Sequence, residues 1–310
     1  MLSFAARVYA GETLTVATYN LQNYTLTDRR VEDGFRPEYP KPEAEKAALR
    51  RVIAAMDADV IALQEIGGPG FLNELRRDLK SEGVDYPHGE ALLAWDEMRG
   101  LGVLSRVPLG KITLHRDLRA QRRGAEHDEA VRRGLLEVEV PTSAGVVTVF
   151  VVHLKSRITE TKEDPAAEDQ RVAEAQAVRD RVLEIFPEPG AARFVIAGDF
   201  NDEPGSRALK AIQARGKTEI SHWVDAADER RQRWTHAYGR TASYSRFDHV
   251  FVSGGLIREG GGGGGSAGRG AADTVGGVAS VSARIVGEPW EAVVAASDHR
   301  PVVLTLRLAE

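Results

Sequence analysis

The sequence predicts an α/β protein built on mixed β-sheets. Short β-branched runs alternate with only a few helical stretches, and some neighbouring runs are joined by short connections. Because a parallel pair of strands needs a crossover of a dozen or more residues, the short connections indicate antiparallel pairs as well. Mixed sheets therefore fit the pattern better than a doubly wound parallel sheet.

The N-terminal part begins with a strand, a helix and a second strand. The β-branched run Thr13–Tyr19 predicts the first strand, and the charged, proline-containing residues 25–42 predict a loop. Apolar residues at helical spacing predict a helix over Glu43–Met56, and Asp59–Leu63 reads as a buried strand. These signals together predict a strand–helix–strand unit whose strands end in polar residues.

The same signals continue along the chain. The further predicted elements are a helix over Phe71–Lys80, strands over Gly102–Ser105, Leu135–Val140 and Gly145–Val152, a helix over Glu168–Phe186, a strand from Phe194, a short helix over Ser206–Gln213, and strands over Phe247–Ser253 and Pro301–Leu308.

One segment, residues 254–277, breaks the pattern with six consecutive glycines, Gly260–Gly265. We interpret it as a mobile surface loop between two strands. The alternative, a phosphate-binding glycine loop, needs a helix N-terminus after it, and no such helix is predicted. Residues 13–310 are therefore predicted to form one domain that carries this glycine-rich loop.

Composition limits the class of protein. Hydrophobic residues make up 42% of the chain, which supports a sizeable core, and the formal net charge of −5 means that a bound polyanion would need a local basic patch. The absence of cysteine excludes disulfides, thiolate catalysis and cysteine-ligated zinc. No run approaches the roughly 18 apolar residues of a membrane span, and nothing indicates an obligate protein partner.

Residues 1–12 are expected to form a separate N-terminal segment. Val8 and Ala10 have the spacing of a secretory cleavage site, but a charged start and a full apolar stretch are missing. Two interpretations stay open: the remnant of an export signal, which would place the protein outside the cytoplasm, and an ordinary frayed terminus.

Polar residues gather at the ends of five predicted strands. Each has an ordinary structural explanation when taken alone, but the strand ends of one sheet edge converge, so together they predict a shared pocket. Asp199 and Asn201, two apart on an extended segment, are expected to project from the same side. The five groups are Asn20, Gln64 with Glu65, His153, Asp199 with Asn201, and Asp298 with His299.

The donor atoms of this pocket favour a hard divalent cation. Glu65, Asp199, Asn201 and Asp298 offer carboxylate and amide oxygens, which Mg²⁺ and Mn²⁺ prefer. Zinc fits this oxygen-rich set less well.

The remaining polar residues suit the hydrolysis of a phosphoester. His299 is placed to act as a general base on water, and Asp248 is the candidate carboxylate on its other ring nitrogen. His153, Lys155 and Arg133 supply donors for phosphoryl oxygens as negative charge develops on them.

Seven motifs in order resemble those of a known superfamily. They are Thr18–Asn23, Leu63–Glu65, Gly102–Pro108, Val152–Ser156, Gly198–Asn201, Tyr244–Asp248 and Ser297–Pro301. The chain thus resembles the endonuclease/exonuclease/phosphatase (DNase I-like) superfamily, which includes pancreatic deoxyribonuclease, exonuclease-III-like enzymes, inositol polyphosphate 5-phosphatases and bacterial sphingomyelinases. The run His153–Arg157, with Gln170, Arg171 and Gln176, is most similar to its bacterial nuclease-like members.

This resemblance implies a four-layer α/β/β/α sandwich of two mixed β-sheets flanked by helices. It also implies cleavage of a phosphoester by metal-assisted attack of water. By the same match, Asn20 and Glu65 fall at metal-site positions, and Asp298 falls at a metal or active-site acid position. Asp199 and Asn201 fall at positions that hold the attacking water and the phosphate.

The resemblance assigns roles to further residues. His299 falls at the general-base position with Asp248 as its partner, and His153 falls at the phosphate-binding histidine. Arg133 matches only a looser basic position on the preceding strand.

Local features favour a nucleic acid as substrate. The basic residues between His115 and Arg133 either track a nucleic-acid backbone or form a solvated loop, because acidic neighbours dilute their charge. Trp234 either lies beside the substrate, as an aromatic does in relatives, or packs into the core.

The leading hypothesis is a Mg²⁺- or Mn²⁺-dependent nuclease that cleaves DNA or RNA phosphodiesters. A phosphatase or phosphodiesterase for a small or lipid-linked phosphoester is the alternative. A catalytically inactive binding module is a second alternative, although a competent residue fills every expected catalytic position.

Overall fold

The structure is a computed structural model that describes residues 13–31, 34–159, 161–239, 241–257 and 278–308. The predictions for residues 1–12, and for all but residues 254–257 of the glycine-rich segment, fall outside these ranges.

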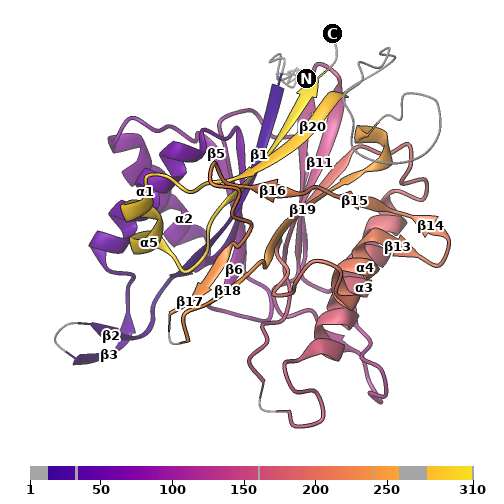
Figure 1. Ribbon diagram of the computed structural model, residues 1–310, viewed down its shortest axis with the longest axis horizontal. Coiled ribbons are helices and arrows are strands. Elements are labelled where there is room, and N and C mark those ends of the chain that lie inside the picture. Colours follow the sequence, from indigo (N-terminus) through magenta and orange to yellow (C-terminus); the bar gives the residue numbers. More distant parts are fainter. Residues whose placement is uncertain (1–12, 32–33, 160, 240, 258–277, 309–310) are drawn as a thin grey trace, which may run out of the picture.

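Two large β-sheets form the centre of the molecule (Figure 1). The first has the strand order β16 (Ala226–Ala227), β20 (Val278–Ile285), β21 (Val302–Leu308), β1 (Thr13–Tyr24), β4 (Val60–Ile66), β6 (Gly100–Ser105) and β5 (His88–Leu92). The second has the order β15 (Ser221–Trp223), β19 (Asp248–Ser253), β12 (Phe194–Asp199), β11 (Gly145–His153), β10 (Leu135–Thr142) and β7 (Ile112–His115).

Both sheets are mixed, as the short connections predicted. β1 runs parallel to β4, β16 to β20, and β11 to β12, whereas the other neighbouring pairs in the two sheets are antiparallel. The parallel pairs β1–β4 and β11–β12 enclose the helices that the sequence predicted between them.

Helices cover the outer face of each sheet, which completes a four-layer α/β/β/α sandwich (Figure 1). α1 (Glu43–Met56), α2 (Pro69–Ser81) and α5 (Trp290–Ala296) pack on the first sheet. α3 (Glu168–Ile185) and α4 (Arg207–Gln213) pack on the second. The predicted fold class is thereby confirmed.

Three apolar clusters hold these layers together. The central one joins the inner faces of the sheets through side chains such as Val16 and Val195, both fully buried. The outer clusters join each sheet to its helices, for example Ile53 of α1 on the first sheet and Val178 of α3 on the second. Since no strand is shared by the two sheets, the central cluster determines how they lie against one another.

The prediction of a loop over residues 25–42 is wrong for most of this segment. β2 (Thr27–Val31) pairs with β3 (Gly34–Tyr39) in an antiparallel hairpin that extends from the body of the molecule (Figure 1). None of the described residues of the hairpin is buried, so it carries no apolar pattern that predicts a strand. β5, β7, β20 and α5 were also not predicted; most are short.

One glycine brings two site-bearing strands close together. A Cβ atom on Gly198 would lie 1.9 Å from the carbonyl oxygen of Val152 on β11. Gly198 of β12 pairs with Val152, and Asp199 pairs with His153. The Gly-Asp sequence thus allows the aspartate and the histidine to sit side by side.

No helix among the described residues is long and apolar enough to span a membrane.

Candidate active site

A cavity of about 430 Å³ opens where strands of both sheets end. Eight of the residues predicted for the site line it: Glu65, Arg133, His153, Lys155, Asp199, Asn201, Asp298 and His299. Asn20 and Asp248 are buried and contact these residues from behind. Trp234 lies outside this cavity, in two neighbouring pockets.

Asp199 lies at the centre of the site. Its Oδ1 accepts a hydrogen bond of 2.8 Å from the backbone amide of Asn201, and its Oδ2 accepts one of 3.0 Å from Nδ2 of Asn20. The Nε2 atoms of His153 and His299 lie 3.5 and 3.8 Å from the same Oδ2. Burial raises the pKa of Asp199 to about 7. The contact with Asn20 joins the two sheets, since Asn20 belongs to β1 and Asp199 to β12.

A left-handed turn, rather than an extended strand, brings Asn201 to the site. β12 ends at Asp199, and Asn201 has a φ of 53°, a conformation that asparagine tolerates better than most residues. Its side chain donates to the carbonyl oxygen of Leu154 over 3.0 Å and is therefore fixed. Asp199 and Asn201 do lie close together, as predicted. The reason is the turn after β12, whereas the sequence had suggested one face of an extended strand.

His299 and Asp248 form a buried pair. Nδ1 of His299 donates to Oδ2 of Asp248 over 2.8 Å, which leaves Nε2 facing the cavity. Burial disfavours the charged ring, but the carboxylates of Asp248 and Asp199 outweigh it and raise the pKa of His299 well above its ordinary value. The pair thus stabilises the imidazolium that forms when Nε2 takes a proton.

Positive charge gathers on one wall of the cavity. Arg133 is buried, and its Nε and Nη1 make no hydrogen bond, although Nε lies 3.4 Å from Oδ2 of Asp96 in an ion pair. Burial and then Arg133 lower the pKa of Lys155, and the same two causes lower that of His153 well below its ordinary value. Arg99 and Arg132 extend this cationic wall, which we define as Arg99, Arg132, Arg133 and Lys155.

Sequence reasoning missed several residues of the cavity. His236 lies between Asp298 and Phe247: its Nε2 is 3.7 Å from Oδ2 of Asp298, and its ring stacks on Phe247 at 5.0 Å between ring centroids. Arg99 enters from the connection between β5 and β6, where its Nε donates to Oδ1 of Asn23. The position of His236 two residues after Trp234 could have identified it as a candidate site residue. Arg99 belongs to none of the sequence motifs, so no such signal exists for it.

The basic segment between His115 and Arg133 does not act as one unit. His115 is buried against Glu137, at 2.8 Å, and Arg122 and Arg123 line a separate pocket beside α3. Of this segment, only Arg132 and Arg133 line the cavity that contains Asp199 and His299.

The cavity suits a divalent metal ion of the hard type. Four carboxylates line it, those of Glu65, Asp96, Asp199 and Asp298, and that of Asp96 is paired with Arg133. Oε2 of Glu65 accepts from the backbone amide of Asn23 over 2.8 Å, and Oε1 has no hydrogen-bond partner among the described residues. Oxygen donors of this kind fit Mg²⁺ or Mn²⁺. His236, Asp298 and His299 also bring potential ligand atoms within 4.8 Å of one another.

The four-layer fold and this cavity define a protein of the DNase I-like class. The chain belongs to the Endonuclease/Exonuclease/phosphatase family, whose model matches residues 17–299. Members of this family hydrolyse phosphoester bonds with the help of divalent metal ions. A comparison with curated proteins gives no significant match.

Solved structures share the fold at low sequence identity. The endonuclease/exonuclease/phosphatase from Bacteroides vulgatus has a TM-score of 0.60 and 16% identity, with 96% of this chain and 99% of that chain covered. Beta toxin from Staphylococcus aureus has a TM-score of 0.59 and 14% identity, covering 94% and 99%. Truncated TDP2 from Caenorhabditis elegans has a TM-score of 0.56 and 14% identity, covering 95% and 97%.

Proposed function

We propose that the chain is a Mg²⁺- or Mn²⁺-dependent nuclease that cleaves phosphodiester bonds of DNA or RNA. The observation that carries this proposal is the cationic wall beside Asp199 and His299. The side chains of Arg99, Arg132, Arg133 and Lys155 all line the cavity, so a phosphate group that enters it meets several cationic hydrogen-bond donors. The net charge of −5 makes this local excess of positive charge distinctive.

The residues of the cavity divide the work of hydrolysis. The neutral form of His299 takes a proton from the attacking water at Nε2, while Asp248 holds Nδ1 and stabilises the charged ring. Asp199 and Asn201 orient the water and the phosphate. His153, held neutral by its lowered pKa, donates a hydrogen bond to a phosphoryl oxygen.

Glu65 and Asp298, supported by Asn20 through Asp199, would hold the metal ion. When bound, the ion supplies Lewis-acid stabilisation of the charge that develops on the phosphoryl oxygens. The cationic wall then holds the neighbouring phosphates of a longer strand, which a small phosphoester does not possess.

A substrate panel tests the proposal. Plasmid DNA, single-stranded DNA, RNA, phosphomonoesters and a small chromogenic diester are incubated with Mg²⁺, Mn²⁺ or EDTA. We expect cleavage of at least one nucleic acid that EDTA abolishes. Turnover of the monoesters alone would favour a phosphatase, and no turnover of any substrate would favour an inactive binding module.

Two substitutions test the assigned roles. Asp199→Ala and His299→Ala are each expected to lower kcat by about a hundredfold or more, the scale of one lost acid–base or electrostatic contributor. Cleavage at the parental rate by either variant would contradict these roles.

A further inference from the structure

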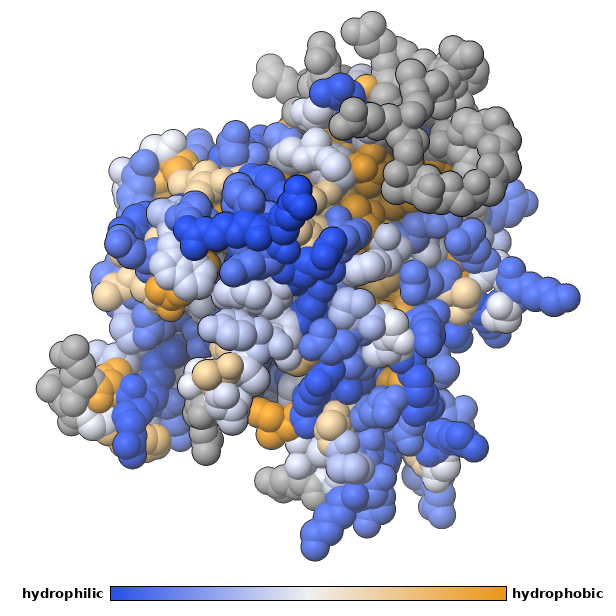
Figure 2. Space-filling model, in the orientation of Figure 1, coloured by the Kyte–Doolittle hydropathy of each residue, from blue (hydrophilic) through white to orange (hydrophobic). Residues whose placement is uncertain are grey.

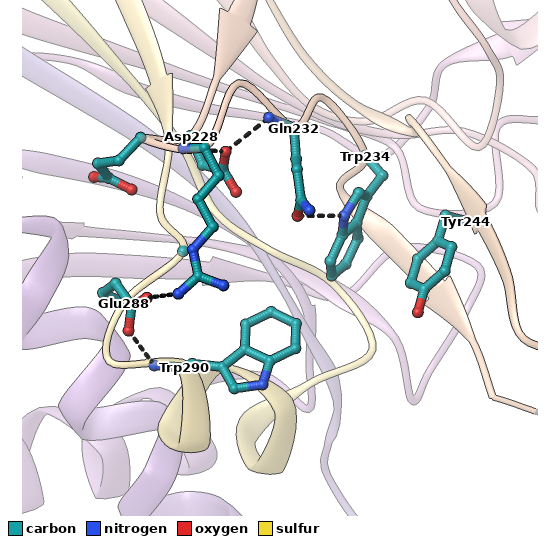
Figure 3. A pocket seen from close by; sticks show the side chains of 9 residues that line it. Asp228, Gln232, Trp234, Tyr244, Glu288 and Trp290 are labelled. Carbon is teal, nitrogen blue, oxygen red and sulfur yellow. Dashed lines mark hydrogen bonds and ion pairs between the residues drawn. The ribbon is translucent and has the colours of Figure 1, made fainter.

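Three aromatic side chains line a pocket of about 490 Å³ near the catalytic cavity (Figure 3). Trp234 precedes β17 (His236–Tyr238), Tyr244 lies on β18 (Ser243–Ser245), and Trp290 begins α5. The ring centroid of Trp234 is 4.9 Å from that of Tyr244 and 6.2 Å from that of Trp290. We call these three residues the aromatic platform.

The platform is accessible to a ligand. Tyr244 is 63% exposed and Trp290 42% exposed, although both are large rings that folding normally buries. An area of intermediate hydropathy covers β17 and β18 on a face that is otherwise largely hydrophilic (Figure 2). Exposed aromatic surface that is gathered around one pocket marks a binding site better than scattered apolar residues do.

The Trp234 ring is held in place before any ligand arrives. The guanidinium of Arg300 lies 4.2 Å from its centroid, and its Nε1 donates to Oε1 of Gln232 over 3.1 Å. Arg300 is fully buried and paired with Asp228 at 2.6 Å. Because Arg300 covers one face of Trp234 and the planes of Tyr244 and Trp290 lie at 49° and 89° to it, the exposed faces of Tyr244 and Trp290 are the ones open to an added ring, and the fixed Trp234 supports them.

A further pocket lies between the platform and the catalytic cavity. This pocket, of about 560 Å³, shares Trp234 with the platform and shares Gln22 and Asp298 with the cavity. Arg300, which supports Trp234, directly follows His299 in the chain. A strand whose phosphate sits at Asp199 and His299 can therefore extend through this pocket to the rings.

The charges around the platform disfavour a phosphate as its occupant. Asp228 is neutralised by Arg300, and Glu288 forms an ion pair with Arg230 at 3.1 Å. Glu229 adds a further negative charge to the lining. The platform thus offers ring faces and hydrogen-bonding edges without excess positive charge, in contrast to the cationic wall.

We infer that the aromatic platform is a stacking subsite for an unpaired nucleobase next to the phosphodiester that is cleaved. The inference rests on the proposed nuclease function and narrows its substrate to single-stranded nucleic acid. Aromatic side chains stack on any base, but a base inside a duplex already has both faces covered. The strand therefore places its phosphates along the cationic wall and a neighbouring base on the platform.

Binding measurements with and without bases test this inference. A fluorescent thymidine dodecamer and an abasic dodecamer with the same phosphates are titrated with the protein in Mg²⁺, and binding is followed by anisotropy. All proteins carry His299→Ala so that the strand stays intact. We expect the base-carrying strand to bind about tenfold more tightly than the abasic one, as stacking of one base predicts.

Variants locate the preference on the platform. Tyr244→Ala and Trp290→Ala are expected to remove most of the tenfold preference, and Trp290→Phe, which keeps a ring, is expected to restore it. Phe35→Ala is the matched control, because Phe35 is 61% exposed and lies on the β2–β3 hairpin outside these pockets. It should leave the preference unchanged.

The outcomes separate this inference from the proposed function. Equal binding of both dodecamers, or a preference that survives Tyr244→Ala and Trp290→Ala, would overturn the stacking subsite even if the enzyme cleaves nucleic acid. A preference lost in both variants would support the subsite even if the substrate panel showed no cleavage, in which case the nuclease proposal alone fails.

Discussion

Replacing Asp248 with asparagine removes the negative charge of the buried His299–Asp248 pair but keeps the size and shape of the side chain. Oδ2 of Asp248 accepts from Nδ1 of His299 over 2.8 Å, and Oδ1 is buried without a hydrogen-bond partner. The substitution keeps the volume but adds two N–H donors. It therefore allows two orientations of the amide, and each has a definite cost.

In one orientation the amide oxygen still accepts from Nδ1, and the new amino group occupies the buried position of Oδ1. An unsatisfied buried donor costs about 1–3 kcal/mol of stability, and the imidazolium loses its carboxylate. In the other orientation the amide donates to Nδ1, so the proton of the neutral ring moves to Nε2. The ring then no longer accepts a proton from water.

Either way we expect Asp248→Asn to lower kcat by roughly 10²–10⁴-fold. KM should change little, because Asp248 lies behind the cavity and does not line it. The assay is Mg²⁺-dependent cleavage of a labelled oligonucleotide at several substrate concentrations, with urea unfolding of the same sample to confirm that the variant is folded.

Asp225→Asn is the matched control. Asp225 also carries a paired carboxylate, 2.7 Å from the guanidinium of Arg246, but it lies outside the cavity. It should keep kcat within about a factor of two. A folded Asp248→Asn enzyme with parental kcat, or one whose loss lies wholly in KM, would refute the role given to the pair.

Three further predictions concern stability and metal binding. Gly198→Ala should destabilise the fold by about 3 kcal/mol in urea unfolding, because the added Cβ meets the Val152 carbonyl, whereas Gly70→Ala in open space should be nearly neutral. Burial lowers the pKa of His249 to about 4. Below pH ~6.5 the unfolded chain therefore binds this proton first, so between pH 7 and pH 5 the parent protein should lose about 2 kcal/mol more stability in urea unfolding than His249→Gln loses. Glu65→Gln should weaken Mn²⁺ binding at least about tenfold by calorimetry, and unchanged binding would remove Glu65 from the metal site.

The predictable parts of the fold are those whose burial leaves a periodic pattern. α1 begins at Glu43 and ends at Met56, as predicted, because its inward positions repeat with the helical period. β2 and β3 are paired by backbone hydrogen bonds without a buried face, so their side chains carry no signal. β20 follows the glycine-rich segment, and its alternation of small and polar residues is weak.

The site residues that lie at strand ends could be predicted from the sequence. Those that reach the cavity from loops could not. His153 and Asp199 follow apolar runs, and their pairing follows from the parallel strands β11 and β12. Arg99 and His236 reach the cavity through connections whose course depends on tertiary packing. The sequence also cannot reveal that Trp234 lies beside Tyr244 and Trp290, since Trp290 follows Trp234 by 56 positions.

The pairing of β21 with β1 determines when the site can form during synthesis. β1 is the first described strand and β21 the last, and they are neighbours in the first sheet. His299 lies just before β21, so the ribosome must synthesise the chain from β1 through His299 before His299 can meet Asp199 and Asp248. Closing so long a loop makes this pairing a late and slow event. A nascent chain in which β21 has not yet been synthesised therefore lacks the assembled site, whatever part of the fold has already formed.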